Sequence, residues 1–233
     1  MVAWLSRGRP REIGQAATLM YTLTNANITR ICYRDHAAAD AQLGEAVALA
    51  DEKGAALWKA YGMVLRGCVL TLTGKASDAI QTLSPSIIAV RSTGSTVLIP
   101  FSLPYLAKAQ AELRQFDDAR HSIDEAIAAV ETTNERWCEA DICRMAGEIS
   151  LMFPQPDAAK AEAYFERALS VARKQQAKSW ELRAAMSMAR LWRDQGKRDE
   201  ARELLAPVYG WFTEGFDTLD LKEAKALLDE LAS

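Results

Sequence analysis

The sequence predicts an all-α protein: a right-handed α-solenoid of about five helix hairpins, closed by a C-terminal capping helix. The first observation is a recurring triplet, in which a small residue is followed four positions later by a large one and three positions after that by a small or medium-sized one. Residues spaced in this way share one face of a helix, so a neighbouring helix can approach closely. The triplets are Ala39-Leu43-Ala46, Ala79-Leu83-Ser86, Ala119-Ile123-Ala126, Ala161-Phe165-Ala168 and Ala201-Leu205-Val208.

The second observation is that these triplets recur with a nearly fixed period. Their leading alanines are 40, 40, 42 and 40 residues apart, and a fixed period of about 20 to 50 residues is typical of a solenoid. The segment Phe153-Pro154-Gln155-Pro156 lengthens one inner turn and accounts for the longer step. We therefore expect a single repeat domain over residues 1–233.

Each period is expected to form one hairpin. Asp35, Ser77, Asp117 and Asp157 are the predicted N-caps of the second helices, because a short side-chain oxygen can accept hydrogen bonds from free N–H groups. Gly54 is the predicted C-terminal stop of the first pair. The predicted hairpins span residues 11–52, 55–91, 97–133, 136–176 and 179–212, and the capping helix spans residues 219–231.

Prolines refine these elements. Pro85 and Pro207 fall inside second helices and should bend them, since proline removes a backbone donor and crowds the preceding turn. Pro100 and Pro104 lie near the start of the third hairpin. Because proline is tolerated in the first turn of a helix, we expect that helix to begin close to Leu103.

Composition limits the classes of function. The net charge of −3 argues against a nucleic-acid partner, because there is no basic excess to replace phosphate counterions. The longest apolar runs are far shorter than the roughly 20 residues that span a bilayer, and the start has no adequate apolar stretch for a signal peptide. We expect a cytoplasmic protein without a membrane partner.

Residues 1–10 read as the tail of an earlier repeat, which would leave an exposed flank for self-association through the N-terminal end.

No constellation for catalysis or metal binding is found. The cysteines have no C-x-x-C spacing and are expected to be buried, reduced thiols; they are Cys32, Cys68, Cys138 and Cys143. The two histidines, His36 and His121, do not cluster with cysteines, and each is expected to be a surface residue. His121 lies beside Ser122 and Asp117, but on one short helix without a strained turn. We therefore predict no catalytic residue, no cofactor, no metal and no enzymatic activity.

The pattern Gly196-x4-Ala201-x3-Leu205-x2-Val208, preceded by Ala189 and Trp192, resembles the tetratricopeptide repeat. Gly67 and Ala107 occupy the small position of the first helix in two other repeats. The usual repeat of this family has 34 residues, so a 40-residue version implies helices about one turn longer. The resemblance implies a non-enzymatic module that binds a protein or peptide.

Forty-residue repeats look like those in the sensor arms of maltose-regulator-like bacterial ATPases. The segment from Leu204 to Leu228 resembles the C-terminus of bacterial signalling proteins that fuse a class III adenylate/guanylate cyclase, an ATPase domain and a repeat arm. The cyclase and ATPase motifs are absent from this chain. A phosphate loop reads G-x-x-x-x-G-K-[ST], and Gly74-Lys75-Ala76-Ser77 lacks its first glycine.

The candidate binding surface is the concave face, which the first helix of each pair lines in tetratricopeptide arrays. Counting from the small position, the expected groove residues are Tyr21, Tyr61, Phe101, Lys108, Arg144, Arg183, Arg190 and Arg193. Aromatic residues dominate the N-terminal half and arginines the C-terminal half, which favours a peptide with an apolar and an acidic end. In the alternative interpretation, the aromatic residues are inter-repeat core, and the arginines pair with Glu148, Glu181 and Asp194.

Two functions follow from this reading. The first is a protein- or peptide-binding module, acting as the regulatory or scaffolding arm of a bacterial signalling protein. The second is a sensor arm that holds a small ligand between repeats.

Overall fold

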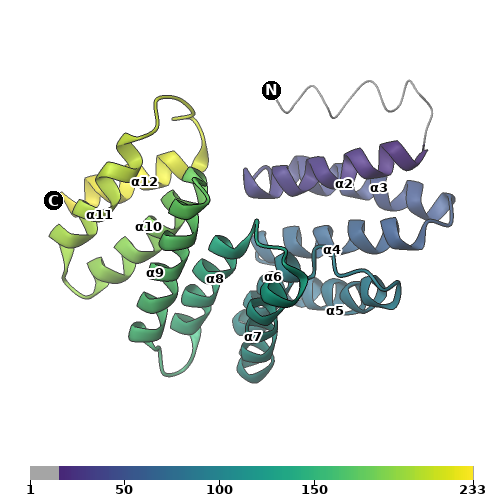
Figure 1. Cartoon of the computed structure of the whole chain (residues 1–233), viewed down its shortest axis with the longest axis horizontal. Coiled ribbons are helices and arrows are strands. Elements are labelled where there is room, and N and C mark those ends of the chain that lie inside the picture. Colours follow the sequence, from purple (N-terminus) through teal and green to yellow (C-terminus); the bar gives the residue numbers. More distant parts are fainter. Residues whose placement is uncertain (1–15, 233) are drawn as a thin grey trace. The chain divides into compact units, whose positions relative to one another are not determined.

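The computed structural model describes residues 16–232, and this part of the chain is built from α-helices without a strand (Figure 1). Residues 1–10, interpreted from sequence as the tail of an earlier repeat, lie outside the described residues. None of the described helices is long and apolar enough to cross a membrane. The helices are α2 (Ala16–Cys32), α3 (His36–Glu52), α4 (Ala56–Leu72), α5 (Ala76–Ser92), α6 (Ile99–Glu112), α7 (Phe116–Thr133), α8 (Glu139–Met152), α9 (Ala158–Lys174), α10 (Lys178–Asp194), α11 (Arg198–Gly210) and α12 (Leu219–Leu231).

The chain divides into two compact units, Met1–Ser122 and Ile123–Ser233. In the first unit, α2 packs against α3 and α4 against α5, while α4 also contacts α2 and α6. In the second unit, α8 packs against α9 and α10 against α11, while α10 also contacts α8 and α12. The first helices of consecutive hairpins therefore contact one another within each unit, which confirms the predicted all-α fold of stacked hairpins. The assignment of the whole chain to a single domain stays a prediction.

The predicted register of the repeat is visible in the burial of its small residues. The five leading alanines are each 0% exposed: Ala39, Ala79, Ala119, Ala161 and Ala201. A Cβ atom at Gly67 of α4 would lie 2.5 Å from Cγ of Leu83 in α5, and a Cβ at Gly147 of α8 would overlap the ring of Phe165 in α9. In these two hairpins, the small position of the first helix thus receives the large residue of the triplet on the second helix.

The turns repeat with the same period. Inside hairpins, Arg34, Gly74 and Arg114 lie 40 residues apart and have φ of 62°, 74° and 60°. Between hairpins, Gly54, Gly94, Asn134 and Gln176 also share a positive φ. Glycine favours this left-handed region and other residues adopt it at a cost of roughly 1–2 kcal/mol. Helix stacking therefore imposes the turn geometry even where no glycine is present.

Two of the four predicted N-caps are confirmed. Asp35 accepts a hydrogen bond from the Ala38 N–H, and Asp157 accepts one from the Lys160 N–H. Ser77 is not a cap, because α5 begins at Ala76 after Lys75. Asp117 lies within the first turn of α7, where a carboxylate still interacts favourably with the positive end of the helix dipole.

The start of α6 differs from the prediction by about one turn. The helix begins at Ile99, with Pro100 in its first turn and Pro104 inside it. Every residue from Ile99 to Ala107 is buried, so hydrophobic burial offsets the backbone hydrogen bond that Pro104 cannot donate. Pro85 and Pro207 also lie inside helices, α5 and α11, and the bends expected there stay predictions.

Candidate interaction surface on helices α8, α10 and α12

The aromatic residues predicted to line the groove lie in the first unit, and two of them are not exposed. Tyr61 is 8% and Phe101 2% exposed, so the expectation that these rings face a ligand is wrong. Tyr61 packs edge-on against Trp58, with ring centroids 5.8 Å apart, and its hydroxyl hydrogen-bonds Ser95 Oγ at 2.7 Å. Tyr21, in contrast, is 58% exposed and contacts Trp58 with centroids 6.0 Å apart.

Phe101 is buried because its helix is enclosed along most of its length. Its ring lies 5.1 Å from that of Tyr105, one turn further along α6. Lys108, on the same helix, is half-buried. Two of the three rings of the predicted aromatic groove are therefore buried, which favours the alternative interpretation that they belong to the core.

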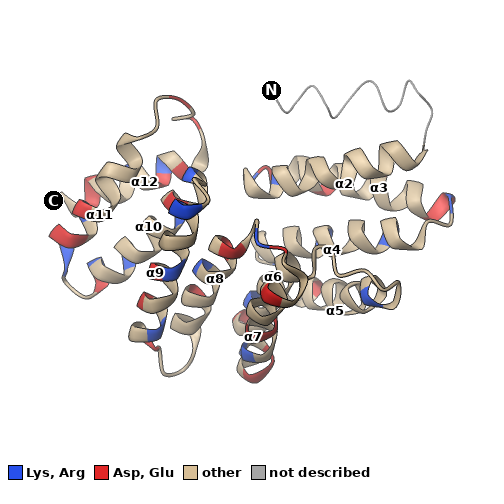
Figure 2. Cartoon of the chain, viewed as in Figure 1, with Lys and Arg blue, Asp and Glu red and all other residues tan. Residues whose placement is uncertain are grey.

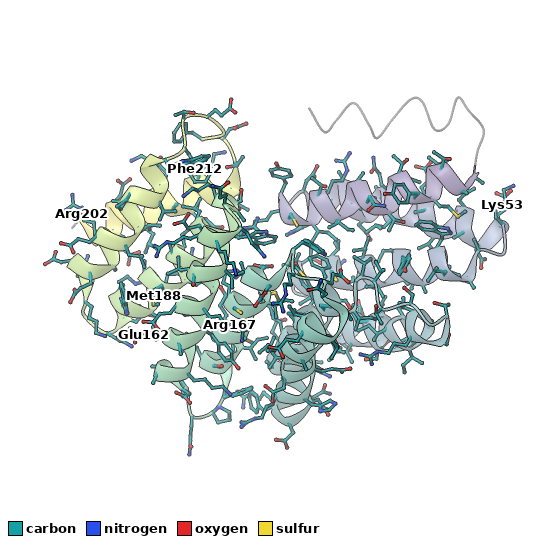
Figure 3. All side chains as sticks on the ribbon, viewed as in Figure 1. Lys53, Glu162, Arg167, Met188, Arg202 and Phe212 are labelled. Carbon is teal, nitrogen blue, oxygen red and sulfur yellow. The ribbon has the colours of Figure 1, made fainter. Side chains whose placement is uncertain are left out.

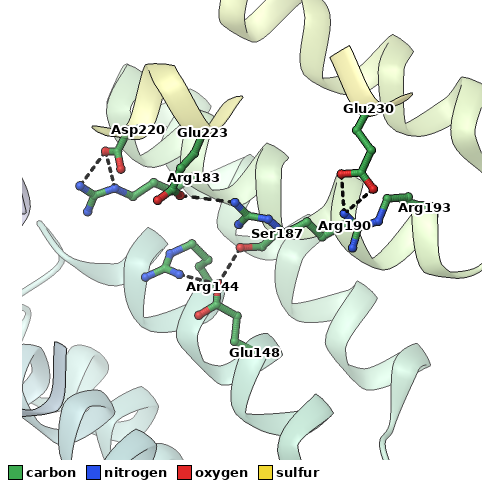
Figure 4. A network of polar contacts seen from close by, with 9 residues as sticks. All are labelled: Arg144, Glu148, Arg183, Ser187, Arg190, Arg193, Asp220, Glu223 and Glu230. Carbon is green, nitrogen blue, oxygen red and sulfur yellow. Dashed lines mark hydrogen bonds and ion pairs between the residues drawn. The ribbon is translucent and has the colours of Figure 1, made fainter. Parts of the chain in front are cut away.

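The predicted arginines lie in the second unit, where they form a network with carboxylates (Figure 4). Arg144 of α8 donates from Nε to Asp141 and from a terminal nitrogen to Glu148, both at 2.7 Å. The same Glu148 oxygen accepts a hydrogen bond from Ser187 of α10 at 2.8 Å. The side chain of Asp141 is only 4% exposed, so Arg144 compensates a buried charge and has a structural role.

Arg183 of α10 also has a largely structural role. Its Nε and a terminal nitrogen each lie 2.7 Å from Asp220 of α12, and its guanidinium lies 5.2 Å from the ring centre of Trp180. Burial would lower the pKa of Arg183, but attraction to Asp220 and Asp141 outweighs it and holds the pKa above its ordinary value. Arg183 therefore links α10 to α12 through two charge-assisted contacts to one carboxylate oxygen of Asp220.

Arg190 and Arg193 are the more accessible members of the network. Arg190 is 41% exposed at its side chain and reaches Glu223 of α12 at 3.4 Å. Arg193 pairs with its neighbour Asp194 at 2.9 Å and with Glu230 of α12 at 3.0 Å. Pairs of this exposure contribute little to stability, with a median of about 0–1 kcal/mol.

Two further glutamates are structural and lie one period apart. Glu139, at the start of α8, contacts Arg136 at 3.1 Å and Arg167 at 3.0 Å. Its equivalent Glu181, at the start of α10, contacts Lys178 at 2.7 Å and Arg173 at 2.9 Å, rather than a predicted groove arginine.

The surface is thus mixed in charge, and sequence reasoning missed its acidic half. Figure 2 shows basic and acidic residues interspersed on α8 to α12. The contact of Arg144 with Glu148 agrees with the alternative interpretation, in which Glu148 is one of the arginines' partners. The α12 acids could have been found by placing the capping helix beside α10; they are Asp220, Glu223 and Glu230.

Comparisons with known proteins agree with this architecture. No protein-family model and no curated protein matches the chain. Among solved structures, the chain is similar to a putative kinesin light chain from Podosopora anserina that has nearly identical tetratricopeptide-repeat-like (TPR-like) repeats. The sequence identity is 16% and the TM-score is 0.53, and the match covers 82% of this chain and 93% of that one. A variant of that protein with one substitution gives a TM-score of 0.54 at the same identity and coverage. The chain therefore has a TPR-like repeat fold.

Proposed function

We propose that the chain is a non-enzymatic protein-interaction module that binds a peptide segment across α8, α10 and α12. TPR-like folds supply extended surfaces built from successive first helices. In the second unit these helices carry a row of polar side chains rather than an apolar one, so the partner is recognised by hydrogen bonds and charge.

The observation that carries this proposal is that the arginines differ in exposure and in the number and length of their contacts with carboxylates. Arg144 and Arg183 are enclosed by short contacts, whereas Arg190 makes one long contact with Glu223. A guanidinium has five N–H donors in a fork that matches a carboxylate. Arg190 can therefore donate hydrogen bonds to a peptide carboxylate, while the neighbouring Glu223 and Glu230 can accept hydrogen bonds from donors of the same peptide. The preferred segment carries both acidic and basic residues.

In the cell, the module would serve as the regulatory or scaffolding arm of a bacterial cytoplasmic signalling protein. This part of the proposal rests on the resemblance of the segment from Leu204 to Leu228 to cyclase–ATPase–repeat proteins.

Selection of a displayed random peptide library on the purified chain tests peptide binding. Selected peptides are then titrated against Arg190→Glu and against a matched control, Arg202→Glu. Arg202 is exposed on α11, outside the network (Figure 3). We expect Arg190→Glu to weaken binding at least tenfold, because it replaces a donor by a repelling carboxylate, and Arg202→Glu to leave it unchanged. Equal affinities for both variants would remove Arg190 from the site.

A second candidate function is a small-ligand sensor arm. One observation favours it: an open pocket with a volume of about 390 Å³ lies among α9, α10 and α11. A ligand that binds the folded state alone raises the melting temperature. Thermal shift against a metabolite panel therefore tests this function separately from peptide binding.

A further inference from the structure

The pocket of the second unit combines an apolar floor with one polar rim. Met188 and Trp192 of α10 face it between the second helices α9 and α11, together with Leu169 and Leu204. The rim follows one face of α9 at four- and three-residue intervals and consists of Glu166, Ser170 and Arg173. Met188 and Trp192 lie on the side of α10 away from Arg183 and Arg190, because these positions differ by about half a turn. The pocket is therefore separate from the peptide surface proposed above.

The indole of Trp192 is held in a fixed orientation at this floor. Its Nε1–H donates to Glu162 of α9 at 2.7 Å, and the ring is half-buried. Met188 is 1% exposed and packs against the same cluster (Figure 3 labels Met188 and Glu162). A pre-oriented aromatic ring beside the half-buried Leu204 suits an apolar ligand body, with Met188 supporting the ring from beneath.

The charge of the pocket lining is divided along α9, with Glu166 at one end of the rim and Arg173 at the other. Arg173 pairs with Glu181 at 2.9 Å, but Glu181 also pairs with Lys178, so a cation is favoured only at the Glu166 end. Over residues 16–232, no cation forms an ion pair with Glu162 or Glu166. Glu162 already accepts the indole N–H of Trp192, so Glu166 is the carboxylate that the lining offers to a ligand. The carboxylate of Glu166 and the hydroxyl of Ser170 are acceptors one helical turn apart.

We propose that this pocket binds a small organic cation with an apolar body. The ammonium group interacts with Glu166, Ser170 and the π face of Trp192, while the hydrocarbon part covers Leu204 and the remaining exposed part of the Trp192 ring. This inference names the ligand chemistry for the second candidate function and rests on it only in placing a small molecule in the pocket.

Three probes of equal chain length test the inference: hexylammonium, hexanol and hexanoate. Each is titrated into the ¹⁵N-labelled chain, following the indole N–H resonance of Trp192, which is assigned with Trp192→Phe. We expect hexylammonium to shift this resonance and to bind at least threefold more tightly than hexanol and tenfold more tightly than hexanoate. Glu166→Gln should reduce the affinity for hexylammonium to that for hexanol and leave hexanol binding unchanged.

Glu203→Gln is the matched control, because it removes a carboxylate from exposed α11 outside the pocket lining and should not change any affinity. Equal binding of the three probes would overturn the cation assignment and leave the small-molecule pocket. No shift with any probe would overturn both. Arg190→Glu should change none of these titrations, so the result is distinguishable from the outcome for peptide binding.

Discussion

The close approach of α4 and α5 makes Gly67→Ala a sharp test of hairpin packing. The new Cβ would lie 2.5 Å from Cγ and 2.7 Å from Cδ2 of Leu83, and 3.4 Å from its backbone nitrogen. Leu83 is 0% exposed, and its Cγ cannot move far without displacing α5. Overpacking costs about 1–3 kcal/mol, and contacts this short correspond to the upper part of that range. Alanine regains up to about 1 kcal/mol of helix propensity, so we expect a net loss of about 1–2 kcal/mol.

Urea unfolding followed by far-ultraviolet circular dichroism measures this loss. Gly44→Ala, in α3 of the same unit, is the matched control, because its Cβ meets no atom within 4 Å. This control should stabilise the unit by up to about 1 kcal/mol through propensity alone. Opposite signs for one chemical change would separate packing from propensity.

A double-mutant cycle with Leu83→Ala then isolates the contact. The leucine truncation alone should cost about 2–5 kcal/mol, and clearly less when Gly67→Ala is present, because the added methyl fills part of the vacated space. If Gly67→Ala were as stable as the unsubstituted chain, or if the cycle showed no coupling, the two helices would not approach as described.

Three further predictions concern turns, acid stability and thiol reactivity. Arg114→Gly should raise the free energy of unfolding by about 1 kcal/mol, because Arg114 has φ of 60° in a region that favours glycine; urea unfolding checks this, with Gly74→Ala expected to lower it. For Glu181, burial would raise the pKa, but hydrogen bonds from two cations hold it below its ordinary value of 4.5, so its contribution to stability is present above pH 4.5 and is lost as pH falls through the lower folded-state pKa. Melting temperatures of Glu181→Gln should therefore fall less steeply below pH 4.5 than those of the unsubstituted chain. Burial raises the pKa of Cys143 to about 11, so it should react with a thiol reagent only on unfolding, whereas half-buried Cys32 should react first; mass spectrometry of the labelled chain distinguishes the two sites.

The repeat could be predicted from sequence because its determinants are local. The spacing of Ala79 and Leu83 fixes which face of α5 is buried, whatever the rest of the chain does. Asp157 as an N-cap depends only on the turn that follows it. The prediction of Ser77 as an N-cap is wrong, because α5 already begins at Ala76 with Lys75 in the cap position. Local sequence leaves helix boundaries uncertain by a few residues.

The candidate surface could be predicted only in part, because it depends on contacts between distant segments. The sequence predicts Arg183 on a first helix and a capping helix over residues 219–231, but only the packing of α12 against α10 shows that Asp220, 37 residues later, meets Arg183. Likewise, the period aligns Tyr61 with Phe101, but only neighbouring helices decide how far each ring is buried. Charge pairing and burial are properties of the assembled unit.

The most direct test of the interaction surface is chemical-shift mapping with a library-selected peptide on the ¹⁵N-labelled chain. The amides of α8, α10 and α12 should show the largest perturbations, centred on Arg190 and Glu223 and absent in Arg190→Glu. Perturbations confined to α9 and α11, or unchanged by that substitution, would contradict the account.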